Sequence, residues 1–252
     1  MEDRPRPARA SRFFKPRPAP RLYGPGMNGE TSELSTPAAA GGTVDPTGVP
    51  LGALLAFAAA QAVPVVRAIR DEQLGAPTPC AEYDVKDLVN HLFHVVVEFQ
   101  ALAAKESADF SATPDYVARG DGWRERFAEE ADGLVAAWSA PGADEGTTGA
   151  LDLPAATVGA MALLDLTVHA WDLARATGQE FGAAYEQGSG PGDGAAGADG
   201  PRVLEALHVA VAEMAPTARS LGMFGDPVPV RDGASALERL LAATGRDPGA
   251  RG

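Results

Sequence analysis

Residues 153–178 read LPAATVGAMALLDLTVHAWDLARATG, and this stretch decides the fold class. Pro154 suits the first turn of a helix, where the amide hydrogen that proline lacks would have no helical partner. Gly178 suits the position just after the last turn, where a left-handed backbone is common. The residues between them are mostly small or apolar, so we predict one long, buried helix.

Three ionisable side chains interrupt the apolar run between Leu153 and Leu173, namely Asp165, His169 and Asp172. Their spacings of four and three residues place them on one face of the helix. Burying a lone carboxylate is costly unless a charge or hydrogen bond compensates it. Two ligands at positions i and i+4 can hold one metal ion. The motif alone leaves two interpretations open, a metal-binding pair or a hydrogen-bonded pair within one helix.

Apolar residues recur at helical spacing in five further segments, and no series of strands accompanies them. Asp84 and Asp87 lie at the head of one of these segments, as capping carboxylates do. The stretch GTTGALDLP is expected to form a short extended connection. We therefore predict an all-α bundle. The predicted helices are 51–71 with a kink at Pro64, 85–104, 122–138, 154–177, 201–221 and 236–243.

The N-terminal residues 1–46 are predicted to be a disordered tail, because they are rich in Pro, Gly, Ser and Thr. Residues 1–26 carry a net charge of +5, so a chain with −13 overall has −18 in the remainder. Such an acidic body disfavours nucleic-acid binding. The tail lacks the apolar core of a signal peptide, and Met27 is an alternative start to Met1.

The remaining residues, 47–252, are expected to form a single domain with a flexible loop at 187–200. The longest apolar stretches, such as 51–66, are shorter than the roughly 20 residues of a membrane span, so we expect no membrane insertion. Cys80 is the only cysteine, which excludes an intrachain disulfide. With no sign of an oxidising compartment, the cytoplasm is the default expectation.

His91 is the predicted third ligand, because it lies among apolar residues on the stripe of the helix 85–104. Glu98, on nearly the same face, is either a further acidic ligand or a solvated carboxylate. His94 is either a substitute ligand or a partly exposed histidine. Cys80 is either a nucleophile near a helix N-terminus or a small buried thiol.

Three segments together resemble the mycothiol-dependent maleylpyruvate isomerase family of DinB-like metal-binding bundles, especially its short single-domain members. These segments are TPCAEYDVKDLVNHL, LLDLTVHAWDLARATGQ and LERLLAATGRDP. The resemblance covers residues 47–250. It implies a DinB-like up-down four-helix bundle with an additional short C-terminal helix. It also implies that His91, Asp165 and His169 bind the metal ion.

The same resemblance implies a function. Three nitrogen and oxygen ligands suit Zn²⁺ with one open position, although Ni²⁺ or Mn²⁺ are alternatives. In the family this position is thought to accept the thiol of mycothiol, which then attacks a small electrophile. The expected activity is isomerisation or thiol transfer. A non-catalytic metal- or thiol-binding bundle and a metal-dependent hydrolase are the alternatives.

Two features depart from the family's characterised isomerase. Asp165 replaces a glutamate ligand, and the chain leaves no room for an additional C-terminal domain, which motivates the non-catalytic alternative. Asp172 and Arg175 are candidate cofactor-binding residues. Asp172 would orient a metal-binding histidine, and Arg175 would meet an anionic thiol or substrate, unless it only complements the helix dipole. The expected partners are a small-molecule thiol and an electrophile, and the expected state is a monomer or homodimer.

Overall fold

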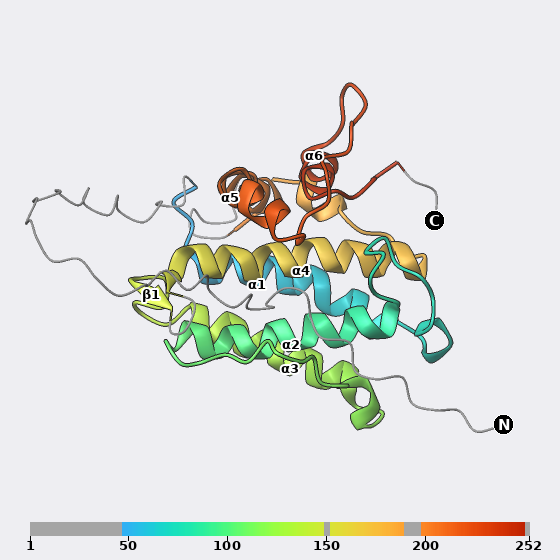
Figure 1. Ribbon diagram of the computed structural model, residues 1–252, viewed down its shortest axis with the longest axis horizontal. Coiled ribbons are helices and arrows are strands. Elements are labelled where there is room, and N and C mark those ends of the chain that lie inside the picture. The colour runs from blue at the N-terminus through green and yellow to red at the C-terminus, as the bar shows by residue number, and fades with distance from the viewer. Residues whose placement is uncertain (1–46, 149–151, 189–197, 250–252) are drawn as a thin grey trace, which may run out of the picture.

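The computed structural model describes residues 47–148, 152–188 and 198–249. The predicted tail 1–46 and most of the predicted loop 187–200 lie outside these residues. The described part of the chain is mostly helical, which confirms the all-α prediction (Figure 1). Its helices are α1 (Leu51–Ala68), α2 (Val85–Ala103), α3 (Trp123–Trp138), α4 (Ala155–Thr177), α5 (Gly200–Ser220) and α6 (Ala236–Ala243), with short 3₁₀ turns η2 (Asp71–Gln73), η3 (Val117–Arg119) and η5 (Ala183–Glu186).

Helices α1 to α4 form a four-helix bundle in which α1 and α2 each pack against both α3 and α4. The Nε1 of Trp138, at the end of α3, donates to the carbonyl of Phe99 near the end of α2. Gln73, just after α1, donates to the carbonyl of Thr177 at the end of α4. Thus α2 and α3 run in the same direction and α1 and α4 run in the same direction. The long connection 104–122 carries the chain from the end of α2 back to the start of α3. The four helices therefore run up, down, down, up, and only α2 and α3 depart from strict up-down alternation.

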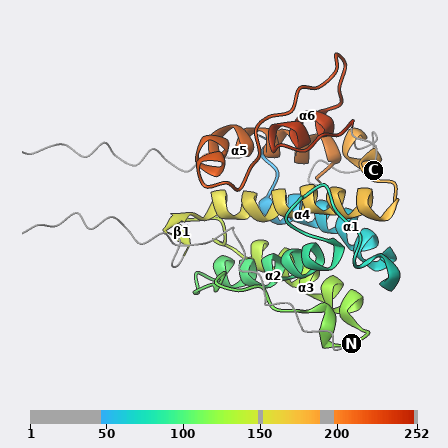
Figure 2. The same cartoon turned by 45° about the vertical axis from the view of Figure 1, so that its right-hand side comes forward.

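Helices α5 and α6 lie together on the outer side of α4 (Figures 1 and 2). Their N-termini are capped by side chains: Asp199 accepts from Arg202 N, and Ser235 and Glu238 form a reciprocal capping box. The predicted short C-terminal helix, 236–243, is therefore present with the expected bounds.

The predicted extended connection is present as two short strands, β1 (Thr147–Thr148) and β2 (Leu153–Pro154). They pair antiparallel, with Thr148 opposite Leu153. This pair lies at the end of the bundle where α4 begins (Figure 1).

Helix α1 ends at Ala68, three residues before the predicted end. Ile69 adopts extended backbone angles, and the side chain of Gln73 accepts a hydrogen bond from the amide of Arg70. Within the described residues, α1 is the one helix long and apolar enough to cross a membrane by length and composition, and 44% of that window is buried. Its packing against α3 and α4 accounts for the same apolar composition.

Helix α4 crosses the middle of the structure, between α1 and α2 on one side and α5 on the other. Most of its residues are buried, and it ends at Gly178, whose φ of 72° is the left-handed conformation predicted from the sequence. The ionisable residues of α4 therefore lie inside the protein, where each needs a partner.

Candidate metal centre

Helix α2 carries His91 into the interior. The helix begins after Asp84, whose Oδ1 accepts a hydrogen bond from Asp87 N at 2.8 Å, as the two aspartates predicted. The His91 side chain is 1% exposed. The ring of Tyr83, just before the helix, stacks on the His91 ring with centroids 5.2 Å apart and planes 17° apart. His91 is thus held by its helix and by an aromatic neighbour.

Helix α4 carries the other three predicted site residues on one buried face. Asp165 is 7% exposed, His169 is 2% exposed and Asp172 is fully buried. His169 lies between the two carboxylates: its Nε2 is 3.7 Å from Asp165 Oδ1, and its Nδ1 is 3.0 Å from Asp172 Oδ2. Each imidazole nitrogen of His169 therefore faces a different carboxylate.

The two helices bring His91, Asp165 and His169 together. The rings of His91 and His169 meet edge to face with centroids 5.0 Å apart and planes 89° apart. One ligand atom from each of the three residues lies within 4.8 Å of the other two. Zinc bonds of about 2.0–2.2 Å to nitrogen and oxygen require donor atoms closer than this by about an ångström, so small side-chain rotations would let the three share one ion. The donor set and its burial fit a divalent cation.

The local electrostatics favour the same conclusion. Burial raises the pKa of Asp165 to about 6, although His169 and Arg246 partly oppose this effect. Burial, with nearby His169, lowers the pKa of His91 well below its usual range, so His91 is neutral at pH 7 and retains a nitrogen lone pair. A cation between these residues would compensate the buried carboxylate and use that lone pair.

Arg246 is the residue at this site that the sequence analysis missed. It follows α6, and its Nη2 donates to Asp172 Oδ2 at 3.1 Å. The sequence offered one signal, the C-terminal segment LERLLAATGRDP that contains it. Arg175, predicted as the basic residue of the site, is exposed instead, with its guanidinium 5.9 Å from the centre of the Trp171 ring. The cation that approaches Asp172 is therefore Arg246.

Cys80 lies close to His169 and Asp172. Its Sγ and ligand atoms of His169 and Asp172 also lie within 4.8 Å of one another. However, Asp172 Oδ2 already bonds both His169 and the positively charged Arg246, so this group disfavours a second cation. Cys80 is only partly buried, but this burial raises the pKa of its thiol to about 11, so the thiol keeps its proton at neutral pH.

His94 and Glu98 form a separate polar cluster further along α2. His94 Nδ1 is 3.2 Å from the Tyr116 hydroxyl and 3.8 Å from Glu98 Oε1. Glu98 Oε2 accepts from the amide of Asp109. Within the described residues, neither side chain belongs to a group of three ligand atoms close enough to hold a metal ion.

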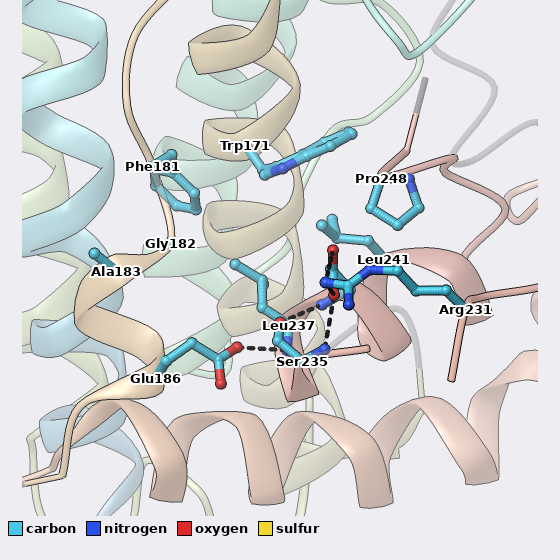
Figure 3. A pocket seen from close by; sticks show the side chains of 11 residues that line it. Trp171, Phe181, Gly182, Ala183, Glu186, Arg231, Ser235, Leu237, Leu241 and Pro248 are labelled. Carbon is cyan, nitrogen blue, oxygen red and sulfur yellow. Dashed lines mark hydrogen bonds and ion pairs between the residues drawn. The ribbon is translucent and has the colours of Figure 1, made fainter. Parts of the chain in front are cut away.

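A surface pocket of about 310 Å³ lies where η5 and α6 meet α4 (Figure 3). Trp171 and Phe181 line it with Leu237 and Leu241, and its polar rim includes the ion pair between Arg231 and Glu238. Its lining contains none of the three candidate metal ligands. The side of α4 that carries Trp171 thus forms a hollow separate from the candidate metal centre.

Comparison with known families matches residues 55–174 to the mycothiol maleylpyruvate isomerase N-terminal domain. The matched segment is a little under half of the chain, and it is similar to that domain. The matched segment contains His91, Asp165 and His169, whereas Arg246 lies beyond it. The family's description links the domain to mycothiol, a small-molecule thiol.

Two similar proteins come from Mycobacterium tuberculosis, one from strain CDC 1551 and one from strain H37Rv. Both are described as uncharacterized proteins, and each is 34% identical over 119 residues. The match covers 44% of this chain and 58% of each relative, so the chain spans a little over half their length. No solved structure matches the chain significantly.

Proposed function

We propose that this protein binds one divalent cation through His91, Asp165 and His169 and uses it, with mycothiol or a related small thiol, to act on a small electrophile. One observation carries the proposal: buried ligand atoms from three residues on two helices lie within 4.8 Å of one another. The family match adds the link to mycothiol. Zinc is the proposed cation, since two imidazole nitrogens and one carboxylate oxygen suit it and leave a fourth position open.

A bound divalent cation would lower the pKa of a coordinated thiol, so that the thiol is a thiolate at neutral pH. The chain's own residues prepare the site for this chemistry. His91 is neutral, and Asp165 supplies a negative charge that partly balances the cation. Asp172 bonds His169 Nδ1 and orients its ring, so that Nε2 points toward Asp165.

The protein's own thiol is a poor substitute for an external one. Cys80 keeps its proton at neutral pH because its pKa is raised to about 11, chiefly by burial. Among the described residues it is the only cysteine. The proposal therefore assigns the nucleophile to the small thiol, and it places the protein in the cytoplasm, where such thiols are kept reduced. The role of Arg175 in binding an anionic group remains a prediction.

Thiol dependence tests this function directly. Zinc-loaded protein is incubated with mycothiol and either maleylpyruvate or 1-chloro-2,4-dinitrobenzene, and the products are followed by mass spectrometry. An isomerase converts maleylpyruvate to a product of equal mass with the thiol regenerated, whereas a transferase gives a thiol adduct. Both activities should require mycothiol and disappear in His169→Ala.

Two outcomes would favour the alternatives. Tight mycothiol binding without turnover of either electrophile would favour a non-catalytic binding bundle, an alternative motivated by Asp165 in place of glutamate. Hydrolysis of an activated ester by the zinc-loaded protein without thiol would favour a metal-dependent hydrolase. Wild-type protein that takes up no stoichiometric zinc, nickel or manganese would contradict the proposal itself.

A further inference from the structure

Three side chains from two distant parts of the chain form a continuous series of polar contacts behind the candidate metal centre. Asp172 Oδ2 lies 3.0 Å from His169 Nδ1 and accepts a hydrogen bond from Arg246 Nη2 at 3.1 Å. One carboxylate oxygen thus joins a candidate metal ligand of α4 to an arginine of the C-terminal segment.

The burial of these groups makes the arginine necessary. The Asp172 side chain is fully buried, and that of Arg246 is 11% exposed. A buried carboxylate needs a compensating charge or hydrogen bond, and the guanidinium of Arg246 supplies both to Asp172. A carboxylate paired with a guanidinium can only accept hydrogen bonds. His169 must then carry its proton on Nδ1, which leaves the lone pair of Nε2 on the side of Asp165.

The backbone around Arg246 fixes where its side chain begins. Helix α6 ends in a Schellman motif, in which Arg246 N donates to Leu241 O at 3.0 Å and Gly245 N donates to Ala242 O at 3.1 Å. Gly245 has a φ of 89°, and a Cβ there would come within 2.6 Å of the Gly225 backbone. Only glycine suits this position, and the turn it permits delivers Arg246 to Asp172.

We propose that Arg246 is a positioning residue for the metal centre: acting through Asp172, it fixes the tautomer and ring orientation of His169. This inference rests on the proposed metal-binding function. It also extends the site beyond the matched segment 55–174, because the α6 segment becomes part of what determines metal affinity.

The first experiment measures the affinity for Zn²⁺ by competition with a chromophoric chelator. We expect Arg246→Ala to weaken binding about 10- to 100-fold, the usual effect of removing a residue that supports a metal-bound histidine. Arg246→Lys should recover part of the loss, because it restores the charge but not the guanidinium geometry. Arg231→Ala is the matched control, since it removes an exposed ion pair with Glu238 and leaves Asp172 untouched.

The second experiment reads the tautomer of His169 in metal-free protein by long-range ¹H–¹⁵N NMR. The wild type should show the proton on Nδ1, and Arg246→Ala should show a mixture of tautomers. Circular dichroism checks that each variant remains helical. If Arg246→Ala does not fold, the NMR spectra of the wild type and of Arg246→Lys still report the tautomer of His169. This measurement does not depend on metal binding.

The outcomes separate the two ideas. If Arg246→Ala binds Zn²⁺ as tightly as wild type while His169→Ala does not, the positioning role is wrong and the metal centre stands. A wild-type His169 with its proton on Nε2 would also overturn the positioning role. If the wild type binds no Zn²⁺, the proposed function fails, and the role of Arg246 at a metal centre fails with it.

Discussion

The imidazole rings of His91 and His169 meet edge to face, with centroids 5.0 Å apart, although they come from different helices of the bundle. Both rings are almost fully buried. Two buried imidazoles beside a buried carboxylate form an arrangement that a divalent cation would stabilise. The predictions below follow from this arrangement.

His91→Ala should abolish stoichiometric zinc binding, because it removes one of three proposed ligands. His94→Ala is the matched control: it removes another buried histidine of α2, one that contacts Tyr116 rather than the proposed ligands. Each protein is dialysed against zinc, and its zinc content is measured by inductively coupled plasma mass spectrometry. Wild type and His94→Ala should each hold about one zinc ion per chain. Equal loss in both variants would contradict the assignment.

Asp165→Asn should stabilise the metal-free protein at neutral pH while weakening zinc binding. The pKa of Asp165 is raised from 3.8 to about 6, so the carboxyl is protonated in both folded and unfolded states below about pH 4. Between about pH 4 and pH 6 the carboxyl ionises more readily in the unfolded state, so the free energy of unfolding of the wild type falls. Above about pH 6 the carboxyl is ionised in both states, and this loss of stability stays constant. A shift of about two pKa units corresponds to roughly 3 kcal/mol.

Urea unfolding with a chelator, from pH 4 to pH 8, tests this prediction. The free energy of unfolding of Asp165→Asn minus that of wild type should increase with pH by up to about 3 kcal/mol. Subtracting the wild-type curve removes the contributions of the other groups, including Asp172, whose pKa is shifted in the opposite direction. A difference that does not change with pH would show that Asp165 is not held in a desolvated environment.

Tyr83→Ala should weaken zinc binding several-fold, whereas Tyr83→Phe should leave it nearly unchanged. The ring of Tyr83 stacks on His91, and phenylalanine keeps that ring while losing the hydroxyl. Chelator competition gives both affinities. Equal weakening in the two variants would mean that the hydroxyl, rather than the ring, is what supports the site.

Gly159→Ala should destabilise the bundle by about 1–3 kcal/mol through overpacking. A Cβ at this position of α4 would overlap the side chain of Leu51 and lie 3.0 Å from the Trp138 ring. Gly75→Ala is the control, because nothing lies within 4 Å of a Cβ there. Thermal unfolding should show a lower midpoint for Gly159→Ala alone, and an unchanged midpoint would contradict the close packing of α1, α3 and α4 at this end.

Much of the fold could be predicted because local patterns determine it. The apolar spacing, Asp84 at the start of α2 and Gly178 at the end of α4 gave helix bounds within a few residues, and the stripe on α4 gave its buried face. The directions of the helices could not be predicted in this way, since the connection 104–122 has no periodic pattern. Only packing reveals that it returns the chain and makes α2 and α3 parallel.

The residues of the candidate site likewise divide into those that local sequence patterns predict and those that only tertiary packing reveals. Asp165, His169 and Asp172 share a helix face by spacing alone, and the apolar neighbours of His91 indicated its burial. Arg246 and Tyr83 reach the site from segments outside regular helices, so their positions depend on tertiary structure. Arg175 was predicted either to meet an anionic thiol or substrate or only to complement the helix dipole, and its exposed position beside Trp171 is compatible with both.

The most direct test of the central claim is anomalous X-ray scattering at the zinc absorption edge from crystals of the zinc-loaded protein. We predict one ordered peak, bonded at about 2.0–2.2 Å to a nitrogen of His91, an oxygen of Asp165 and Nε2 of His169. A peak bonded instead to Cys80 and Asp172, or no ordered peak between the two helices, would contradict the claim.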